Sequence, residues 1–337
     1  IPPHNLGEVV DGLIALIKDK EISDVKLSKI IKGPDFPTGG ELIYNNAINE
    51  VYKTGKGSIT IRGVINTEEI NHGKGKHKKN ALIISELPYQ ISKAGWIEKL
   101  AELVNTGKID GISDIRDESD RDGMRIVIEL KKDSNSDIVI SNLYKKTSLQ
   151  SNFGTIFLAL INGKPIQLNL KKYLCYFLEF REETIRKRTK YFLKNTSEKL
   201  EVMEGLSVAT KNIKKIIAII ENSNNSSEAK SKLITNLLLS GKQAEAVLDM
   251  PLKKLTNLEK NQIDINIKKL VEKKLFFQNL LNKRELLLEL LIEELTMLKK
   301  KYNVKRKTKI LKNINQNNEL ESLNNQILEE LITKKTK

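Results

Sequence analysis

The sequence predicts an α+β fold, in which a mixed part of helices and strands is followed by a long helical part. Two observations carry this prediction. In residues 1–155, short stretches alternate apolar and polar side chains, as half-buried strands do, and turns rich in glycine and proline separate them. From Leu168 onward, apolar residues instead recur at helical spacing, over long stretches with few such turns.

The mixed part begins with a helix predicted over 6–17, where apolar residues follow helical spacing. GPDFPTGG (33–40) predicts a loop, because its two prolines and three glycines fit neither a helix interior nor a central strand. Further helices are expected at 47–52, ended by the glycines of KTGKGS, and at 92–104, with Trp96 and Leu100 on one face. Strands are expected at 58–65, 80–87 and 124–130.

The helical part starts with a stretch, 170–221, that contains no proline and a single glycine, Gly205. About 45 helical residues would make a rod of about 70 Å. The polar run NSNNSS (222–227) interrupts it, short helices follow near 228–239 and 242–249, and a second long apolar-periodic stretch covers 256–302. Two long helices joined by a small helical knot bury their apolar faces best by packing antiparallel, which places the knot at the tip.

Composition favours a polyanionic partner. The chain has 337 residues, a net charge of +15 and a pI of about 9.5, which favours nucleic acid first and an acidic membrane surface second. The alternative is a lysine-rich chain from an AT-rich genome. Cys175, the only cysteine, excludes an internal disulfide and fits a reducing compartment; its apolar helical surroundings predict a buried thiol. No run approaches the roughly 18 apolar residues of a membrane span, so no membrane partner is expected.

The residue pattern predicts no catalytic site, no metal site and no cofactor site in this chain. His4, His72 and His77 have no partner at metal-ligand spacing, and the GKGK around Lys74 lacks the frame of a phosphate loop. The cluster DIRDESDRDGMR (114–125) offers carboxylates to a divalent cation. Its arginines favour the other interpretation, a surface turn in which Arg and Asp side chains pair with each other and cap the following strand.

Two features could contact DNA. The basic segment with Lys74, Lys76, His77, Lys78 and Lys79, together with Lys53, Lys56 and Arg62, makes a positive surface that suits phosphates; a solvated hairpin tip is the alternative. Ile1, held by Pro2 and Pro3, is a stiff apolar wedge of the kind that enters a base step and kinks DNA, although an apolar residue before prolines more often packs in a core.

Several long motifs occur together in one order, and they carry a resemblance that runs to about Leu311. The motifs are IPPHNLGEVVDG (1–12), GPDFPTGG (33–40), YKTGKGS (52–58), ELPYQ (86–90), KIDGISDIRDESDRDGMRIVIELK (108–131), LYKKTSLQSNFG (143–154), FREETIRKRTKYFL (180–193) and AVLDMPLKKLTNLE (246–259). In them the chain resembles the A subunit of bacterial type IIA topoisomerases, DNA gyrase and topoisomerase IV.

The resemblance implies a domain plan. Residues 1–160 would be the α/β tower domain that binds and bends gate DNA. Residues 161–221 and 256–311 would form an antiparallel coiled-coil stalk, and 222–255 would be the all-helical exit gate at its tip, through which two copies dimerise. Residues 312–337 would be a polar tail. The DNA-binding residues expected from the motifs and the charge are Ile1, which the family inserts between bases, and His4, Lys53, Lys56, Arg62, Lys74, Lys76, Lys78 and Lys79.

The resemblance also implies an enzyme, an ATP-dependent topoisomerase that passes one duplex through a double-strand break in another. Its partners would be double-stranded DNA, a second copy of this chain in a homodimer, and the B subunit, which holds the ATP and the magnesium. We expect this chain alone to be inactive, because the family's catalytic tyrosine lies in a winged-helix domain upstream of IPPHN; the C-terminal β-pinwheel is also missing. The expected location is a bacterial cytoplasm, at the nucleoid, or a plastid-type organelle.

Two departures from the family pattern stand out. Pro251 replaces a usual arginine, and YKTGKGS (52–58) has lysine where relatives often have arginine, which keeps the charge but loses bidentate geometry. Gyrase and topoisomerase IV are not distinguished. Two other functions stay open from the residues alone, a non-catalytic coiled-coil dimerisation scaffold and a general basic nucleic-acid-binding protein.

Overall fold

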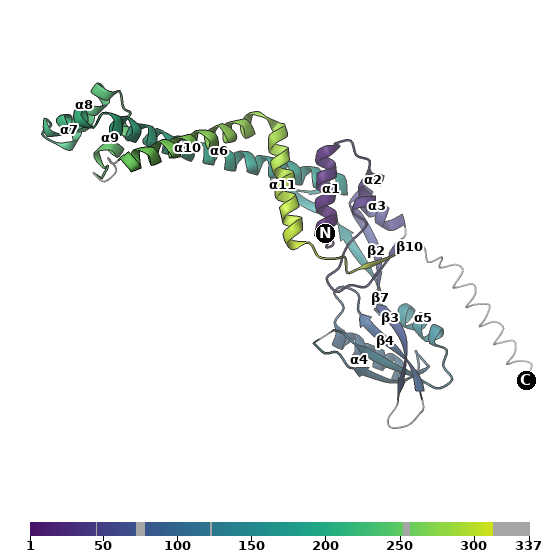
Figure 1. Cartoon of the computed structure of the whole chain (residues 1–337). Helices are drawn as coiled ribbons and strands as arrows, with labels where there is room; N and C mark the ends of the chain where they lie inside the picture. Colours follow the sequence, from purple (N-terminus) through teal and green to yellow (C-terminus); the bar gives the residue numbers. More distant parts are fainter. Residues whose placement is uncertain (45, 72–77, 122, 252–256, 313–337) are drawn as a thin grey trace, which may run out of the picture. The chain divides into compact units, whose positions relative to one another are not determined.

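The computed structural model describes residues 1–44, 46–71, 78–121, 123–251 and 257–312. It confirms an α+β fold, with most of the strands in the first half and the long helices in the second (Figure 1). The chain divides into two compact units: unit 1 comprises Ile1–Tyr176 and the chain from Leu295 onward, and unit 2 comprises Phe177–Glu294. Each is described by itself below.

Unit 1 contains two four-stranded sheets among its described residues. The first has the order β10-β1-β2-β7 and the second the order β3-β4-β6-β5. The strands of the first are β1 (Glu41–Tyr44), β2 (Lys56–Arg62), β7 (Gln150–Ile156) and β10 (Lys309–Lys312). Those of the second are β3 (Val64–Asn71), β4 (Lys78–Glu86), β5 (Ile112–Asp117) and β6 (Ile126–Leu130), and β8 (Leu158–Ile161) pairs separately with β9 (Lys164–Gln167).

Helices accompany these sheets: α1 (Leu6–Lys18), α2 (Asp24–Ile30), α3 (Asn46–Thr54), α4 (Lys93–Asn105) and α5 (Ser136–Lys146). The N-terminus of α1 is set by Asn5, whose side chain accepts hydrogen bonds from the amides of Gly7 and Glu8. In α4, Trp96 and Leu100 are buried against the second sheet, which confirms the predicted apolar face. The helices predicted at 6–17, 47–52 and 92–104 are therefore present, with ends shifted by one or two residues.

The single strand predicted at 58–65 is wrong, because Gly63 divides it into β2 and β3, which belong to different sheets. A Cβ atom on Gly63 would lie 2.6 Å from the carbonyl oxygen of Glu86 and 2.6 Å from Cδ1 of Leu149. The chain can therefore cross from the first sheet to the second at this position only if the residue has no side chain. The strands predicted at 80–87 and 124–130 correspond to β4 and β6.

Strand β10 was not predicted; the second long helical stretch ends at Tyr302, as predicted, and β10 lies beyond it, mostly inside the range that was expected as stalk. The range 256–311, expected as stalk, stops being helical at Tyr302, and β10 then pairs in parallel with β1, with Lys309 opposite Glu41. Asp35 holds the segment that leads into β10, because its carboxylate accepts hydrogen bonds from the amides of Lys307 and Thr308, each at 2.9 Å. A four-residue strand of this kind depends on its partner rather than on its own pattern.

Unit 2 is built from helices, and its long helices run antiparallel. Contacts between them pair rising residue numbers with falling ones: Glu182 with Arg284, Phe192 with Phe277, and Ser207 with Asp264. Figure 1 shows α6 and α10 side by side. The helices of this part of the chain are α6 (Leu170–Lys211), α7 (Ile213–Glu221), α8 (Ser226–Leu237), α9 (Gly241–Leu248), α10 (Asn257–Asn282) and α11 (Arg284–Tyr302).

The two long helical stretches are each interrupted once. The first is interrupted at Asn212, whose side-chain amide donates to the carbonyl of Val208 and so competes with the next helical turn. The second is interrupted at Lys283. Cys175, predicted to be buried, is half-buried. A core of Leu206, Leu233, Val247 and other residues joins α6 to the three short helices and α10.

Candidate nucleic-acid interface

The segment that begins with Ile1 is held by contacts of Pro2 and His4. Ile1 is 55% exposed, while Pro2 is buried. His4 fixes the segment from both ring nitrogens: Nδ1 donates to the carbonyl of Pro2 at 2.8 Å, and Nε2, which is then the acceptor, receives the hydroxyl of Tyr52 at 2.9 Å. An isolated bridge to Pro34 adds a backbone contact. This support leaves the Ile1 side chain as a projecting apolar group.

His4 is a structural residue in this geometry. Burial lowers its pKa from 6.5 to about 4, against the opposing effect of the hydrogen bond to Pro2, and the charge of Arg306 lowers it further. The ring is therefore neutral near pH 7. Both nitrogens already have partners in unit 1, so His4 offers no cation to a phosphate and holds the segment that carries Ile1.

Lys53 and Lys56 lie on either side of the turn that ends α3. Gly55 makes this turn, with φ at +78° and its amide donating to the carbonyl of Val51 at 2.7 Å. Both lysines are exposed, and neither forms an ion pair with any residue that the structure describes. Tyr52, which holds His4, directly precedes Lys53, so the wedge and these two cations are supported by the same short segment.

Arg62 and Lys79 are engaged within unit 1. The Nε of Arg62 donates to Gln150 at 2.5 Å, and the guanidinium lies 4.8 Å from the ring centre of Tyr144. Lys79 lies 3.4 Å from Glu129, whose side chain is only 1% exposed. The charged groups of both side chains therefore already have partners within unit 1. Lys74, Lys76 and His77 lie outside the described residues, as does the side chain of Lys78, although the pairing of β3 with β4 confirms the hairpin that they join.

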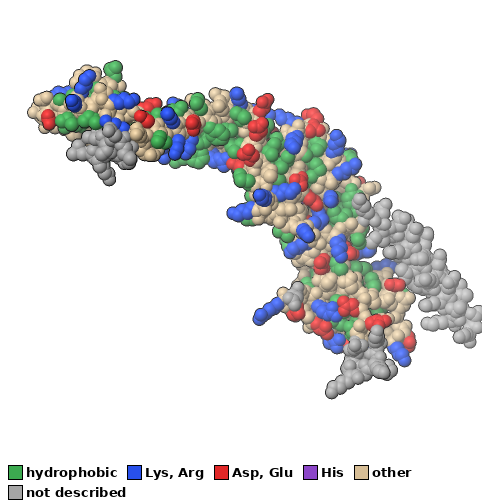
Figure 2. All heavy atoms as spheres, in the orientation of Figure 1, with side chains coloured by type: hydrophobic (Ala, Val, Ile, Leu, Met, Phe, Trp, Pro, Cys, Tyr) green, Lys and Arg blue, Asp and Glu red, His purple; other side chains and the backbone are tan. Residues whose placement is uncertain are grey.

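The basic side chains are not gathered in one patch on the face that Figure 2 shows. On the face shown in Figure 2, lysine and arginine side chains occur on both units and are interspersed with acidic ones. Net charge alone therefore does not mark where a polyanion would bind. A binding site for a polyanion is better indicated by cations that line one concave surface and have no acidic partner.

A basic groove in unit 1 meets this condition and adds cations that the sequence did not single out. It has a volume of about 780 Å³ and is bounded by α2, α3 and the segment that leads into β10. Four exposed lysines line it: Lys29, Lys32, Lys53 and Lys309. Asp24 is the only carboxylate among the groove's described lining residues. No pattern in the neighbouring sequence places these lysines together, because Lys309 reaches the groove only through the pairing of β10 with β1.

Arg306 also lines this groove, but its guanidinium is used inside unit 1. It forms a two-pronged pair with Glu8, at 2.9 and 2.6 Å, and donates to the carbonyls of Gly33 and Pro34. Such forked pairing is the geometry that distinguishes arginine from lysine. The free positive charge of the groove therefore comes from its lysines, which suit non-specific phosphate contacts.

The acidic and basic cluster at 114–125 is held by ion pairs, as the second interpretation predicted. Arg116 and Arg125 pair with glutamates, however, rather than with the aspartates that were expected. Arg116 lies 2.8 Å from Glu129 and 3.4 Å from Glu118, and Arg125 lies 2.7 Å from Glu68. Some of these partners come from outside the cluster. Within the described ranges, no group of three or more His, Cys, Asp and Glu side chains is placed to hold a metal ion. The described helices also include none that is both long and apolar enough to span a bilayer.

Comparison with known proteins decides the family. The family model for the A subunit of DNA gyrase/topoisomerase IV matches residues 1–334. The chain belongs to this family. Similar relatives from Synechocystis sp. include the A subunit of DNA gyrase, 48% identical over 311 residues, and the A subunit of DNA topoisomerase 4, 46% identical over 312 residues. The DNA gyrase A subunit of Halalkalibacterium halodurans is 46% identical over 310 residues.

Each of these matches covers 92% of this chain but only 34–36% of the relative. The chain thus spans about a third of the length of these members of the gyrase and topoisomerase IV family. Three of the motifs that carry the resemblance surround the candidate interface. IPPHN carries Ile1 and His4, GPDFPTGG supplies Pro34 and Asp35, and YKTGKGS contains the turn at Gly55 with its flanking lysines.

Proposed function

We propose that this chain is the part of a type IIA DNA topoisomerase A subunit that binds and bends gate DNA and closes the exit gate. The observation that carries the proposal is the family match over residues 1–334, together with the motifs that gather at the wedge and the turn of Gly55. The relatives are named as DNA gyrase and DNA topoisomerase subunits, so double-stranded DNA is the substrate we assign.

In this proposal unit 1 is the tower. Ile1 enters a base step, and Lys53, Lys56 and the groove lysines neutralise phosphates on the flanking duplex. Bending a site of 20–30 base pairs costs on the order of 1–6 kcal/mol, which phosphate contacts and the inserted side chain offset. The support from His4 favours this role, since an inserted side chain must be held rigidly at its base.

Unit 2 is proposed as the stalk and the exit gate. Its short helices expose apolar side chains that a second copy would cover: Leu238 is 90% exposed, in a left-handed conformation with φ at +53°, and Ile217 and Ile220 are 43% and 42% exposed. A leucine held in that backbone region and almost fully in water is unfavourable in a free surface. We infer that the homodimer contact includes Leu238.

The holoenzyme would add the rest of the reaction. We propose that a B subunit binds ATP and magnesium, that the whole assembly passes one duplex through another, and that it acts at the nucleoid of a bacterium or in a plastid-type organelle. None of the eight tyrosines of this chain is assigned the attack on DNA, because none stands in the family's catalytic motif. The chain by itself is expected to bind and bend DNA without cutting it.

The DNA-binding half is tested by fluorescence anisotropy and by energy transfer across a duplex of about 30 base pairs. Lys53→Glu with Lys56→Glu should weaken binding and reduce the salt slope by about 1–2, since each phosphate contact contributes about 0.9. The matched control is Lys99→Glu with Lys132→Glu, two exposed lysines elsewhere in unit 1. Ile1→Ala should keep the affinity within a few fold and lose the bend. Unchanged bending would contradict the wedge.

The gate half is tested by sedimentation. The parent chain should be a dimer, and Leu238→Asp should shift it to a monomer. Leu275→Asp is the control, because Leu275 is also exposed, at 54%, but lies on α10 rather than on the short helices. A monomeric parent, or equal effects of the two variants, would overturn the gate assignment and favour a general basic nucleic-acid-binding protein.

A further inference from the structure

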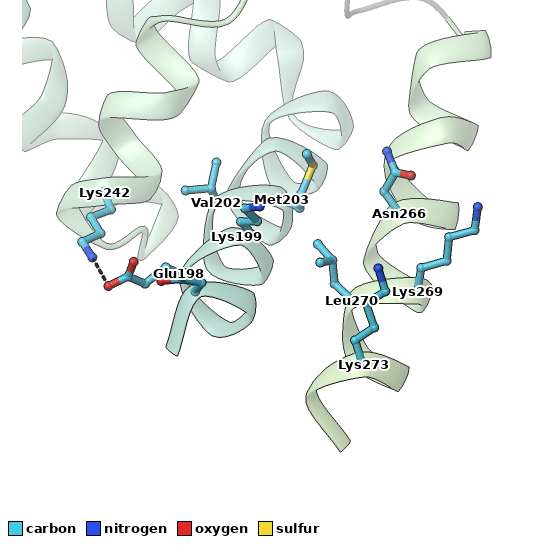
Figure 3. Close-up of a pocket in the computed structure, with 10 residues that line it drawn as sticks. Glu198, Lys199, Val202, Met203, Lys242, Asn266, Lys269, Leu270 and Lys273 are labelled. Atoms are coloured by element: carbon cyan, nitrogen blue, oxygen red, sulfur yellow. Dashed lines mark hydrogen bonds and ion pairs between the residues drawn. The ribbon is translucent and has the colours of Figure 1, made fainter. Parts of the chain in front are cut away.

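A second groove lies within unit 2, between α6, α9 and α10 (Figure 3). Its volume is about 720 Å³, inside the range of about 300–1,000 Å³ that small-molecule sites occupy. The residues that α6 contributes are spaced by three and four positions, and so are those of α10, so each helix turns one continuous face to the groove. Nothing in the proposed handling of DNA uses this groove.

The floor of the groove is apolar. Val202 and Met203 of α6 pack at the edge of the core cluster, and each keeps part of its surface open. Figure 3 shows Leu270 pointing from α10 toward α6. Methionine adapts its shape to irregular neighbours, so a floor of this kind accepts an apolar body without a fixed outline.

Lysines surround this floor. Lys199, Lys269 and Lys273 line the groove, are exposed, and form no ion pair with any residue that the structure describes. A fourth lysine, Lys242 of α9, is satisfied by Glu198 at 3.5 Å (Figure 3). One carboxylate against four ammonium groups leaves an uncompensated positive charge around an apolar surface.

We propose that this groove binds an amphipathic anion, a small molecule with an apolar body and a single carboxylate, sulfonate or phosphate head. The body lies against Val202, Met203 and Leu270. The head lies among Lys199 and Lys269, which come from the two antiparallel helices, and neutralises their like charges. A nucleic-acid strand fits less well, because none of the described lining residues is aromatic and bases would find no stacking surface.

Occupancy would also tighten unit 2. The ligand contacts α6 and α10 together, and α9 is already tied to α6 by the side chain of Gln243, which donates to the carbonyl of Glu201 at 2.9 Å. A ligand that binds the folded form alone raises its stability. Bound anion is therefore expected to raise the melting temperature of the helices while leaving DNA affinity in unit 1 unchanged.

The test uses two probes with the same apolar body on the full chain. 1-Anilinonaphthalene-8-sulfonate carries the anionic head, and N-phenyl-1-naphthylamine lacks it; fluorescence titration gives both dissociation constants. Lys199→Gln with Lys269→Gln should weaken the sulfonate about tenfold, as expected for two exposed charge contacts, and leave the neutral probe unchanged. Leu270→Gln should weaken both probes, and circular dichroism confirms that each variant is folded.

The control is Lys190→Gln with Lys268→Gln, two exposed lysines of α6 and α10 that do not line the groove. It removes the same charge from the same helices and should leave both constants unchanged. The proposal is overturned if the control matches the groove variant, or if the groove variant affects both probes equally. It is also overturned if Leu270→Gln has no effect, which would place the probe elsewhere, such as on the exposed ring of Phe276.

Discussion

Gly55 provides the sharpest test of how unit 1 is built. It ends α3 with φ at +78°, and a Cβ atom at this position would lie 1.9 Å from the carbonyl oxygen of Leu168 and 2.7 Å from its carbon. Two separate effects therefore act on Gly55→Ala. The left-handed backbone costs an alanine about 1–2 kcal/mol. The close atoms belong to the backbone, so no side-chain rotation relieves them, and the resulting shift adds about 1–3 kcal/mol.

Gly107 separates these two effects. Its φ is +67°, close to that of Gly55, but a Cβ atom there would meet nothing within 4 Å. Gly107→Ala should therefore lower the free energy of unfolding by about 1–2 kcal/mol, and Gly55→Ala by about 2–5 kcal/mol. The loss of backbone freedom in the unfolded chain is common to both substitutions and cancels in the difference.

The measurement is urea unfolding followed by tryptophan fluorescence. Trp96 is the only tryptophan of the chain, is 2% exposed and lies in the core of unit 1, so the signal reports this unit rather than the helices of unit 2. The refuting result is a Gly55→Ala variant no less stable than Gly107→Ala. That outcome would mean that the chain near Leu168 does not approach the turn, and the support of Lys53 and Lys56 would have to be reconsidered.

Three further predictions concern unit 1, each read by the same fluorescence. Arg306→Lys should lower the free energy of unfolding by about 2 kcal/mol, because a single ammonium cannot replace the forked pair with Glu8; equal stability would refute this. Because the folded pKa of His4 lies near 4 and its ordinary value is 6.5, the unfolded chain binds a proton in this window that the folded chain does not. Stability should therefore fall as pH drops from 6.5 to 4, by at most about 1.4 kcal/mol per pH unit, and His4→Asn should remove this component of the slope. Arg116→Met should cost about 3 kcal/mol by removing a cation that lies 2.8 Å from the buried carboxylate of Glu129, and adding Glu129→Leu should recover most of it; a double variant as unstable as the single one would contradict the pairing.

One missed element could have been found from sequence. Asn162 and Gly163 lie between β8 and β9 with φ of +51° and +79°, which is the left-handed pair that an Asn-Gly dipeptide favours in a two-residue hairpin. The dipeptide between alternating apolar residues was a sufficient signal. The strand predicted at 58–65 could not have been divided in the same way, because the contact that requires Gly63 comes from Glu86 and Leu149, both distant in sequence.

The residues predicted to contact DNA differ in how accessible the structure leaves them. Ile1, Lys53 and Lys56 stand in motifs, and the structure leaves all three exposed. His4 and Arg62 stand in or near motifs too, but their side chains hold other parts of unit 1, which a residue type alone does not reveal. Lys29, Lys32 and Lys309 were missed because their shared groove depends on strand pairing.

The sequence by itself determined the α+β class, the long helices and the family, because hydrophobic periodicity and motifs are read over neighbouring residues. Only the tertiary structure decided which of these elements pack against one another. The return of β10 to β1 completes the basic groove, and the approach of α9 to Gly205, where a Cβ atom would lie 2.7 Å from Cβ of Gln243, closes the side of unit 2 beside the second groove. The physical reason is that both depend on close packing between segments far apart in the chain, and no local pattern specifies such packing.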